Sequence, residues 1–136
     1  MEENFPGIYL ALTWTYLKKG MTKEAVQAAH TAAKLTESPP PRRAALACVL
    51  AADGQAAEAE RMLSELTASG DKEYVSPLDI ALVTLSLGKV EATFEWLQQA
   101  HQERSPWLNH LKADPLWEPL RSDARFQDLV KRVGIP

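Results

Sequence analysis

Apolar residues recur along most of the chain at the spacing of three and four that places them on one face of a helix. The stretch at 46–67, LACVLAADGQAAEAERMLSELT, contains two such runs separated by Gly54. Two similar stretches, at 12–33 and 80–101, are divided at Gly20 and Gly88, so the three glycines lie 34 residues apart. Glycine readily adopts the left-handed conformation that ends a helix. The pattern therefore predicts three helical hairpins of one kind.

Certain residue types also recur in this 34-residue register. The aligned sets are Leu12, Leu46 and Ile80; Thr13, Ala47 and Ala81; Ala25, Ala59 and Thr93; and Ala32, Leu66 and Ala100. Small side chains recur in most of these sets, as expected where two helices approach closely. Stacked copies of one helical pair bury the same positions in each copy. We therefore expect these positions to form the core.

Prolines, glycines and capping residues give approximate helix bounds. We expect helices at about 6–19, 22–36, 41–53, 55–69, 77–87 and 90–103. The clearest start signal is Ser76 before Pro77, with Asp79 in the first turn, because it combines a capping hydroxyl, a first-turn proline and a carboxylate at the positive helix end.

Beyond Arg104 the period is expected to break, because prolines prevent a long helix. Short helical pieces are predicted from Ser105 and from Asp114. A last helix, capped by Ser122, is predicted at about 123–133.

A unit of two helices and 34 residues, with a small residue early in its second helix and another late in it, resembles the tetratricopeptide repeat. The resemblance covers roughly residues 6–103. It implies an all-α fold that is an α-solenoid. Residues 1–104 would contain three repeats, at about 6–39, 40–73 and 74–104. Residues 105–136 would form a degenerate fourth unit that caps the open end.

A second, narrower resemblance covers the last part of the chain. The strings YVSP at 74–77, ERSPW at 103–107 and PLRSDARF at 119–126 are similar to the terminal segment of bacterial multidomain regulators. In those proteins a tetratricopeptide array follows a Ser/Thr kinase, a nucleotide cyclase or a winged-helix effector. The similarity implies that this chain is the C-terminal sensory or docking part of a longer protein. The alternative is that Met1 is a natural start.

Composition narrows the class of protein. Hydrophobic residues make up 46% of the 136 residues and charged residues 24%, which is typical of a soluble domain. The apolar runs are too short to cross a bilayer, and the N-terminus lacks a secretory signal. The net charge of −3 argues against nucleic acid as a ligand. We expect a cytoplasmic protein that binds neither nucleic acid nor membrane.

No catalytic or metal-binding motif is found. The glycines never form a phosphate-binding loop, and His30, His101 and His110 lack the spacing of a metal site. Cys48, the single cysteine, allows no intrachain disulfide and lies in an alanine-rich segment, so we expect a small buried or groove-lining residue. The sequence therefore predicts no enzyme, no cofactor and no metal.

The four tryptophans are expected to have different roles. Trp96 is predicted to pack inside its hairpin, and Trp107 and Trp117 to hold the cap against the helix at 90–103. Trp14 is expected on the concave face.

The tetratricopeptide resemblance implies where a partner binds, because in that family the first helix of each repeat lines the concave face. Projected onto this sequence, the groove is lined by Leu10, Trp14, Leu17, Ala44, Cys48, Ala51, Leu78, Leu82 and Leu85. Family members that hold a peptide's terminal carboxylate use Lys, Asn and Arg at inward positions. Their absence here argues against that mode of binding and predicts an apolar groove.

An apolar patch of this size on a monomer indicates an occupant. The candidates are an apolar or amphipathic peptide of a partner, a second copy of the chain, or an upstream segment of the parent protein. Alternatively, neighbouring side chains in the short array cover the patch. We expect a non-enzymatic interaction module that binds a protein segment; the alternative is a self-association module that dimerises an attached effector.

Overall fold

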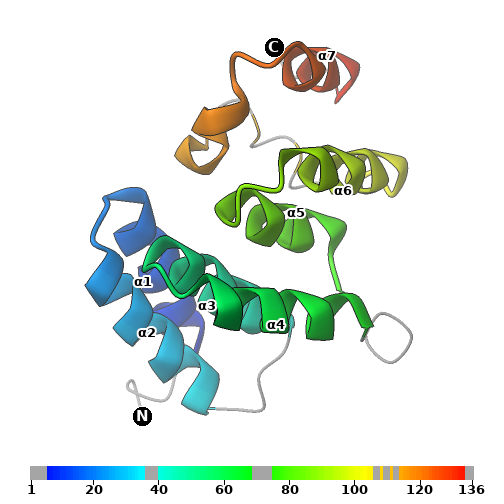
Figure 1. Cartoon of the computed structure of the whole chain (residues 1–136). Coiled ribbons are helices and arrows are strands. Elements are labelled where there is room, and N and C mark those ends of the chain that lie inside the picture. Colours follow the sequence, from blue (N-terminus) through cyan, green and yellow to red (C-terminus); the bar gives the residue numbers. More distant parts are fainter. Residues whose placement is uncertain are drawn as a thin grey trace.

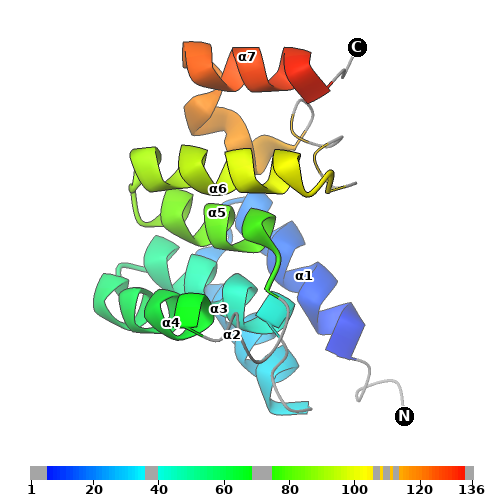
Figure 2. The ribbon, with the colours of Figure 1, turned by 90° about the vertical axis from the view of Figure 1, so that its right-hand side faces the viewer.

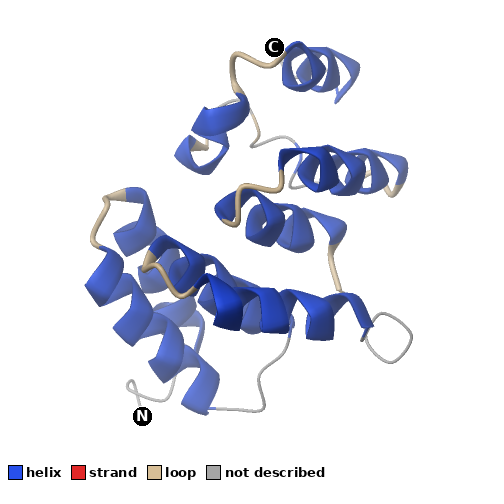
Figure 3. Cartoon of the chain, in the orientation of Figure 1, coloured by secondary structure: helices blue, strands red, loops and turns tan. Residues whose placement is uncertain are grey.

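The computed structural model describes residues 6–35, 40–68, 75–105, 108, 111 and 114–133. This part of the chain is helical and contains no sheet (Figure 3). Its elements are α1 (Pro6–Lys18), α2 (Thr22–Leu35), α3 (Pro40–Ala52), α4 (Ala56–Ala68), α5 (Pro77–Ser86), α6 (Val90–Gln102), the 3-10 helix η4 (Pro115–Leu120) and α7 (Ala124–Val133). They pack as sequential pairs, α1 with α2, α3 with α4 and α5 with α6, which stack in chain order (Figures 1 and 2). The first hairpin and α7 lie at opposite ends of the stack.

The six expected helices of the hairpins are confirmed, and no predicted end lies more than one residue from the observed end. The second helices of the pairs begin at Thr22, Ala56 and Val90, which preserves the 34-residue spacing. None of the helices in the described ranges is both long enough and apolar enough to span a membrane.

The three hairpins share one turn geometry. Gly20, Gly54 and Gly88 have φ of 77°, 83° and 77°, a conformation that costs other residues about 1–2 kcal/mol. In each turn a backbone N–H just after the glycine donates to a carbonyl five residues earlier, which is the hydrogen bond of a Schellman motif. These bonds join Met21 to Tyr16 at 2.9 Å, Gln55 to Leu50 at 2.8 Å and Lys89 to Thr84 at 2.9 Å. The three turns therefore share one backbone conformation and one hydrogen bond.

The recurrent small positions form the core, as expected. The following residues are at most 1% exposed: Thr13, Ala47, Ala81, Ala25, Ala59, Thr93, Ala32, Leu66 and Ala100. Leu46 and Ile80 are also buried, whereas the equivalent Leu12 is only half-buried. Leu12 belongs to the first hairpin, and no described hairpin precedes it to cover that side.

The third hairpin carries a buried polar link. The hydroxyl oxygens of Thr84 on α5 and Thr93 on α6 lie 2.8 Å apart. Each oxygen also lies within hydrogen-bond distance of a backbone carbonyl, that of Ala81 at 2.9 Å and that of Lys89 at 2.8 Å. Two hydroxyl protons serve these three contacts, so two of the hydrogen bonds form at any one time.

The C-terminal unit packs on the third hairpin. Trp117 of η4 is 3% exposed and shares a core cluster with Leu97 and Ala100 of α6, which confirms its expected position. Trp96 is partly buried against the same cluster. Trp107 lies outside the described residues. The helical piece that was expected from Ser105 lies largely outside them as well.

One expectation for this unit was wrong. The cap of α7 is Asp123 rather than Ser122, because the Asp123 carboxylate accepts the backbone N–H of Arg125 at 2.8 Å and binds its guanidinium at 2.9 Å. Such charge-assisted bonds are stronger than those of a neutral hydroxyl. The last helix itself is confirmed, since α7 begins at Ala124, 34 residues after Val90. Between α6 and α7 the described residues contain the short η4 and no long helix, as the prolines predicted.

Candidate functional site

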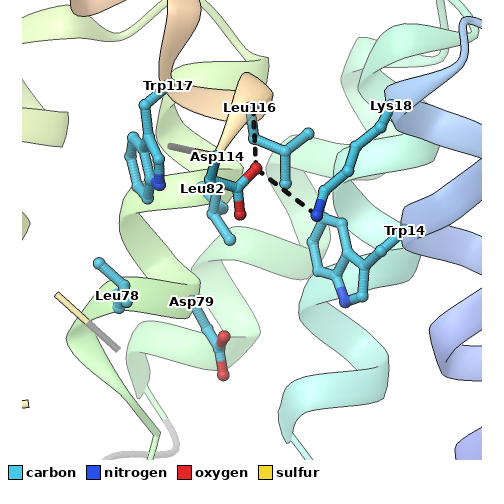
Figure 4. Close-up of a pocket in the computed structure, with 8 residues that line it drawn as sticks. All are labelled: Trp14, Lys18, Leu78, Asp79, Leu82, Asp114, Leu116 and Trp117. Atoms are coloured by element: carbon cyan, nitrogen blue, oxygen red, sulfur yellow. Dashed lines mark hydrogen bonds and ion pairs between the residues drawn. The ribbon is translucent and has the colours of Figure 1, made fainter. Parts of the chain in front are cut away.

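A cavity of about 320 Å3 lies between α1, α5 and η4 (Figure 4). Its walls are formed by Trp14, Lys18, Leu78, Asp79, Leu82, Asp114, Leu116 and Trp117. A second cavity, of about 400 Å3, shares Trp14, Lys18, Leu82 and Leu116 with the first. It continues past Leu17, Cys48, Leu85, Ser86, Pro115, Glu118 and Pro119. The shared walls make the two cavities one trough, which we call the α1–η4 groove.

Helical spacing explains two of the walls. Trp14 and Lys18 lie one turn apart on α1, and Leu78 and Leu82 lie one turn apart on α5, so each pair projects from one face. The third wall is η4, whose first turn carries Leu116. The Asp114 carboxylate fixes the start of η4 by accepting the backbone N–H of Leu116 at 3.0 Å.

Six of the nine residues projected from the sequence line this groove: Trp14, Leu17, Cys48, Leu78, Leu82 and Leu85. Leu10 and Ala51 are half-buried and belong to neither cavity. Ala44 has no exposed surface and lies in the core. The helix that carries it, α3, packs against α1, α2 and α5, so Ala44 is covered and is not available to a partner.

The groove is less apolar than expected. The projection missed Lys18, Asp79, Asp114 and Glu118, which also line it. Lys18 lies four residues after Trp14 and Asp79 three residues before Leu82, so helical spacing could have identified both. No local pattern points to the residues of η4, because they reach the groove only through the fold of the cap.

The charge of Asp114 is neutralised inside the groove. Its carboxylate lies 3.6 Å from the ammonium nitrogen of Lys18, and both side chains are partly exposed (Figure 4). The Arg121 guanidinium also donates to the backbone carbonyl of Asp114 at 2.8 Å. The ion pair joins the end of α1 to the start of η4 across the groove.

Asp79 has a different environment. Its side chain lines the cavity of about 320 Å3, and within the described residues no hydrogen bond or ion pair engages its carboxylate. Burial raises the pKa of Asp79 from 3.8 to about 6. The position in the first turn of α5 favours the negative charge. At neutral pH the groove therefore contains an uncompensated carboxylate.

The geometry of Cys48 does not suit a nucleophile. Its side chain is 1% exposed. Burial raises the pKa of the thiol to about 12, and this effect outweighs the contact with Ser86, which lowers it. His30 is exposed on α2, His101 is half-buried on α6, and His110 lies outside the described residues. In the part of the chain that the structure describes, no three His, Cys, Asp or Glu side chains are grouped to hold a metal ion.

The α1–η4 groove therefore combines apolar side chains, two tryptophans and one uncompensated carboxylate. Mostly apolar walls with a few polar groups are the usual lining of ligand sites in proteins. No family model, curated protein or solved structure matches the chain.

Proposed function

We propose that the chain is a non-enzymatic interaction module that binds an apolar or amphipathic segment of a partner protein in the α1–η4 groove. The observation that carries this proposal is the groove itself, where side chains of α1, α3, α5 and η4 converge on one open trough. Apolar anchors that enter a groove of this kind dominate the affinity of peptide recognition.

The repeat pattern supports a tetratricopeptide-type solenoid as the scaffold. Three hairpins with the same turn, the same helix starts and the same buried small positions are what such an array requires. In this proposal the array is right-handed, η4 and α7 cap its last hairpin, and the chain forms the C-terminal docking part of a longer cytoplasmic bacterial regulator.

The size of the groove limits what it can hold. Cavities of about 320 and 400 Å3 are small for a whole helix but accommodate a few large side chains of a peptide. Because η4 forms one wall, the peptide backbone lies along the mouth and its side chains insert between α1 and η4. Each buried apolar anchor contributes on the order of 1–3 kcal/mol to binding.

Selection of peptides from a phage-displayed library of random dodecapeptides tests this proposal. Selected peptides should bind the protein, and Leu82→Ala should weaken them about tenfold or more because Leu82 lines both cavities. Leu63→Ala is the matched control. Leu63 is a half-buried leucine on α4 that packs on the core and lines neither cavity.

The two substitutions should lower stability by similar amounts, as judged by urea unfolding, while only Leu82→Ala weakens binding. A library that yields no binder contradicts the proposal. So does an equal loss of binding in the two variants.

A second candidate function, self-association, is favoured by one observation. Among the residues that the structure describes, the exposed large apolar side chains are Ile8, at 48% exposure, and Met21, at 38%, and both belong to the first hairpin or its turn. In this alternative a second copy of the chain covers that end and dimerises an attached effector. Light scattering over a concentration series tests it, since a chain that stays monomeric at high concentration is not a dimeriser.

A further inference from the structure

The charges that line the cavity of about 320 Å3 do not balance. Lys18, Asp79 and Asp114 are its charged side chains, and the first and last of these neutralise each other at 3.6 Å. Further along the groove, Glu118 binds Arg121 at 2.8 Å. Among the described residues of the groove, Asp79 is therefore the charged residue that has no counter-charge. Its negative charge makes the groove attract a cation.

The walls around Asp79 suit a cation that has an apolar stem. Trp14, which is half-buried, lines the same cavity, and indole is the side chain that attracts cations most strongly. Leu78 and Leu82 project beside Asp79 from α5 (Figure 4). Lysine and arginine bury their methylene stems against such surfaces while the charged end meets an acceptor.

We propose that the α1–η4 groove selects a segment with a lysine or arginine flanked by apolar residues, and that the Asp79 carboxylate is the counter-charge for that basic side chain. This inference rests on the proposed function, because it names the chemistry of the segment bound there.

The alternative ligands are disfavoured by the same carboxylate. A purely apolar segment would cover Asp79 and remove its remaining water without supplying a partner. An acidic segment would bring like charges together in a partly desolvated site. A basic side chain satisfies the carboxylate and restores neutrality.

The inference includes a dependence of binding on pH. The charged groups that line the same cavity as Asp79 are Lys18 from α1 and Asp114 at the start of η4, and the Cys48 thiol from α3 lies close enough for its pKa to be raised by the Asp79 charge. Since burial brings the pKa of Asp79 to about 6, its carboxylate is ionised at pH 7.5 and mostly protonated near pH 5. Affinity for a basic peptide should fall several-fold over this range.

The experiment repeats the dodecapeptide selection on the wild type, on Asp79→Asn and on the control Asp53→Asn. Asp53 is exposed in the turn between α3 and α4, so its replacement removes the same charge away from the groove. Peptides selected by the wild type and by Asp53→Asn should be enriched in lysine or arginine between apolar residues. The enrichment should disappear with Asp79→Asn, which should also bind a wild-type-selected peptide about tenfold more weakly.

A double-mutant cycle completes the test. Replacing the selected lysine or arginine of the peptide with norleucine should cost about tenfold in affinity on the wild type and almost nothing on Asp79→Asn. Selected peptides without enriched basic residues, or an equal norleucine effect on both proteins, overturn this inference and leave the proposed function standing. A library that yields no binder overturns both.

Discussion

The ammonium nitrogen of Lys18 lies 3.6 Å from a carboxylate oxygen of Asp114, so the last residue of α1 is paired with the residue that starts η4. The second and third hairpins lie between these residues in sequence, yet the two residues meet because η4 lies across the groove from α1. The pair closes one side of the groove. It also offers a direct test of how strongly the cap is held.

The two partners of this ion pair should differ in their contribution to stability. Lys18→Gln should lower the free energy of unfolding by less than about 1 kcal/mol, because the pair is partly exposed. Asp114→Ala should lower it by about 1–2 kcal/mol, since it also removes the acceptor for the Leu116 N–H. Urea unfolding of both variants measures the difference. Equal losses would show that capping of η4 contributes nothing.

The glycine turns should be equivalent in energy. No heavy atom lies within 4 Å of the place where a Cβ would stand on Gly54 or Gly88, so alanine meets no steric obstacle there. The positive φ alone should then cost about 1–2 kcal/mol for Gly54→Ala and the same for Gly88→Ala. Urea unfolding tests this expectation, and a large loss at only one of the two turns contradicts it.

Asp79→Asn should stabilise the protein in a pH-dependent way. The pKa of Asp79 in the folded state, about 6, lies above its ordinary value of 3.8, so the folded state binds the proton more tightly than the unfolded chain. The stability that protonation contributes is present at low pH and is lost as pH rises from about 4 to about 6.

At pH 7.5 the neutral asparagine should therefore gain on the order of 1 kcal/mol after allowance for partial exposure and for the favourable helix N-terminus. At pH 4.5 the gain should be smaller. Urea unfolding at both pH values checks this, with Asp53→Asn as control. A gain that does not change with pH would mean that the ionised carboxylate carries no penalty.

Cys48 should react slowly with thiol reagents in the native protein. Its side chain is 1% exposed, and burial raises the pKa of the thiol to about 12. Labelling by a chromogenic disulfide at neutral pH should be on the order of a thousandfold slower than that of a free cysteine. The rate should become normal in guanidinium chloride. Rapid labelling of the native protein would point to a reactive thiol and would reopen an enzymatic role.

Local interactions explain why so much of the fold was predictable. Gly20, Gly54 and Gly88 end helices through their own backbone conformation, and the 34-residue spacing of these turns repeats along the chain. The cap residue of α7 was assigned wrongly because Ser122 and Asp123 are both good capping residues. Only the observed hydrogen bond to Arg125 distinguishes them.

By itself, the sequence determined the helices, their pairing and the buried small positions, because these depend on spacing within one hairpin and on its neighbour. The tertiary structure decided that η4 crosses back to Lys18, that Ala44 is covered, and that Asp79 is left desolvated without a partner. Those outcomes depend on contacts between distant segments and on how far water is excluded. Neither is encoded in the periodicity of any single stretch.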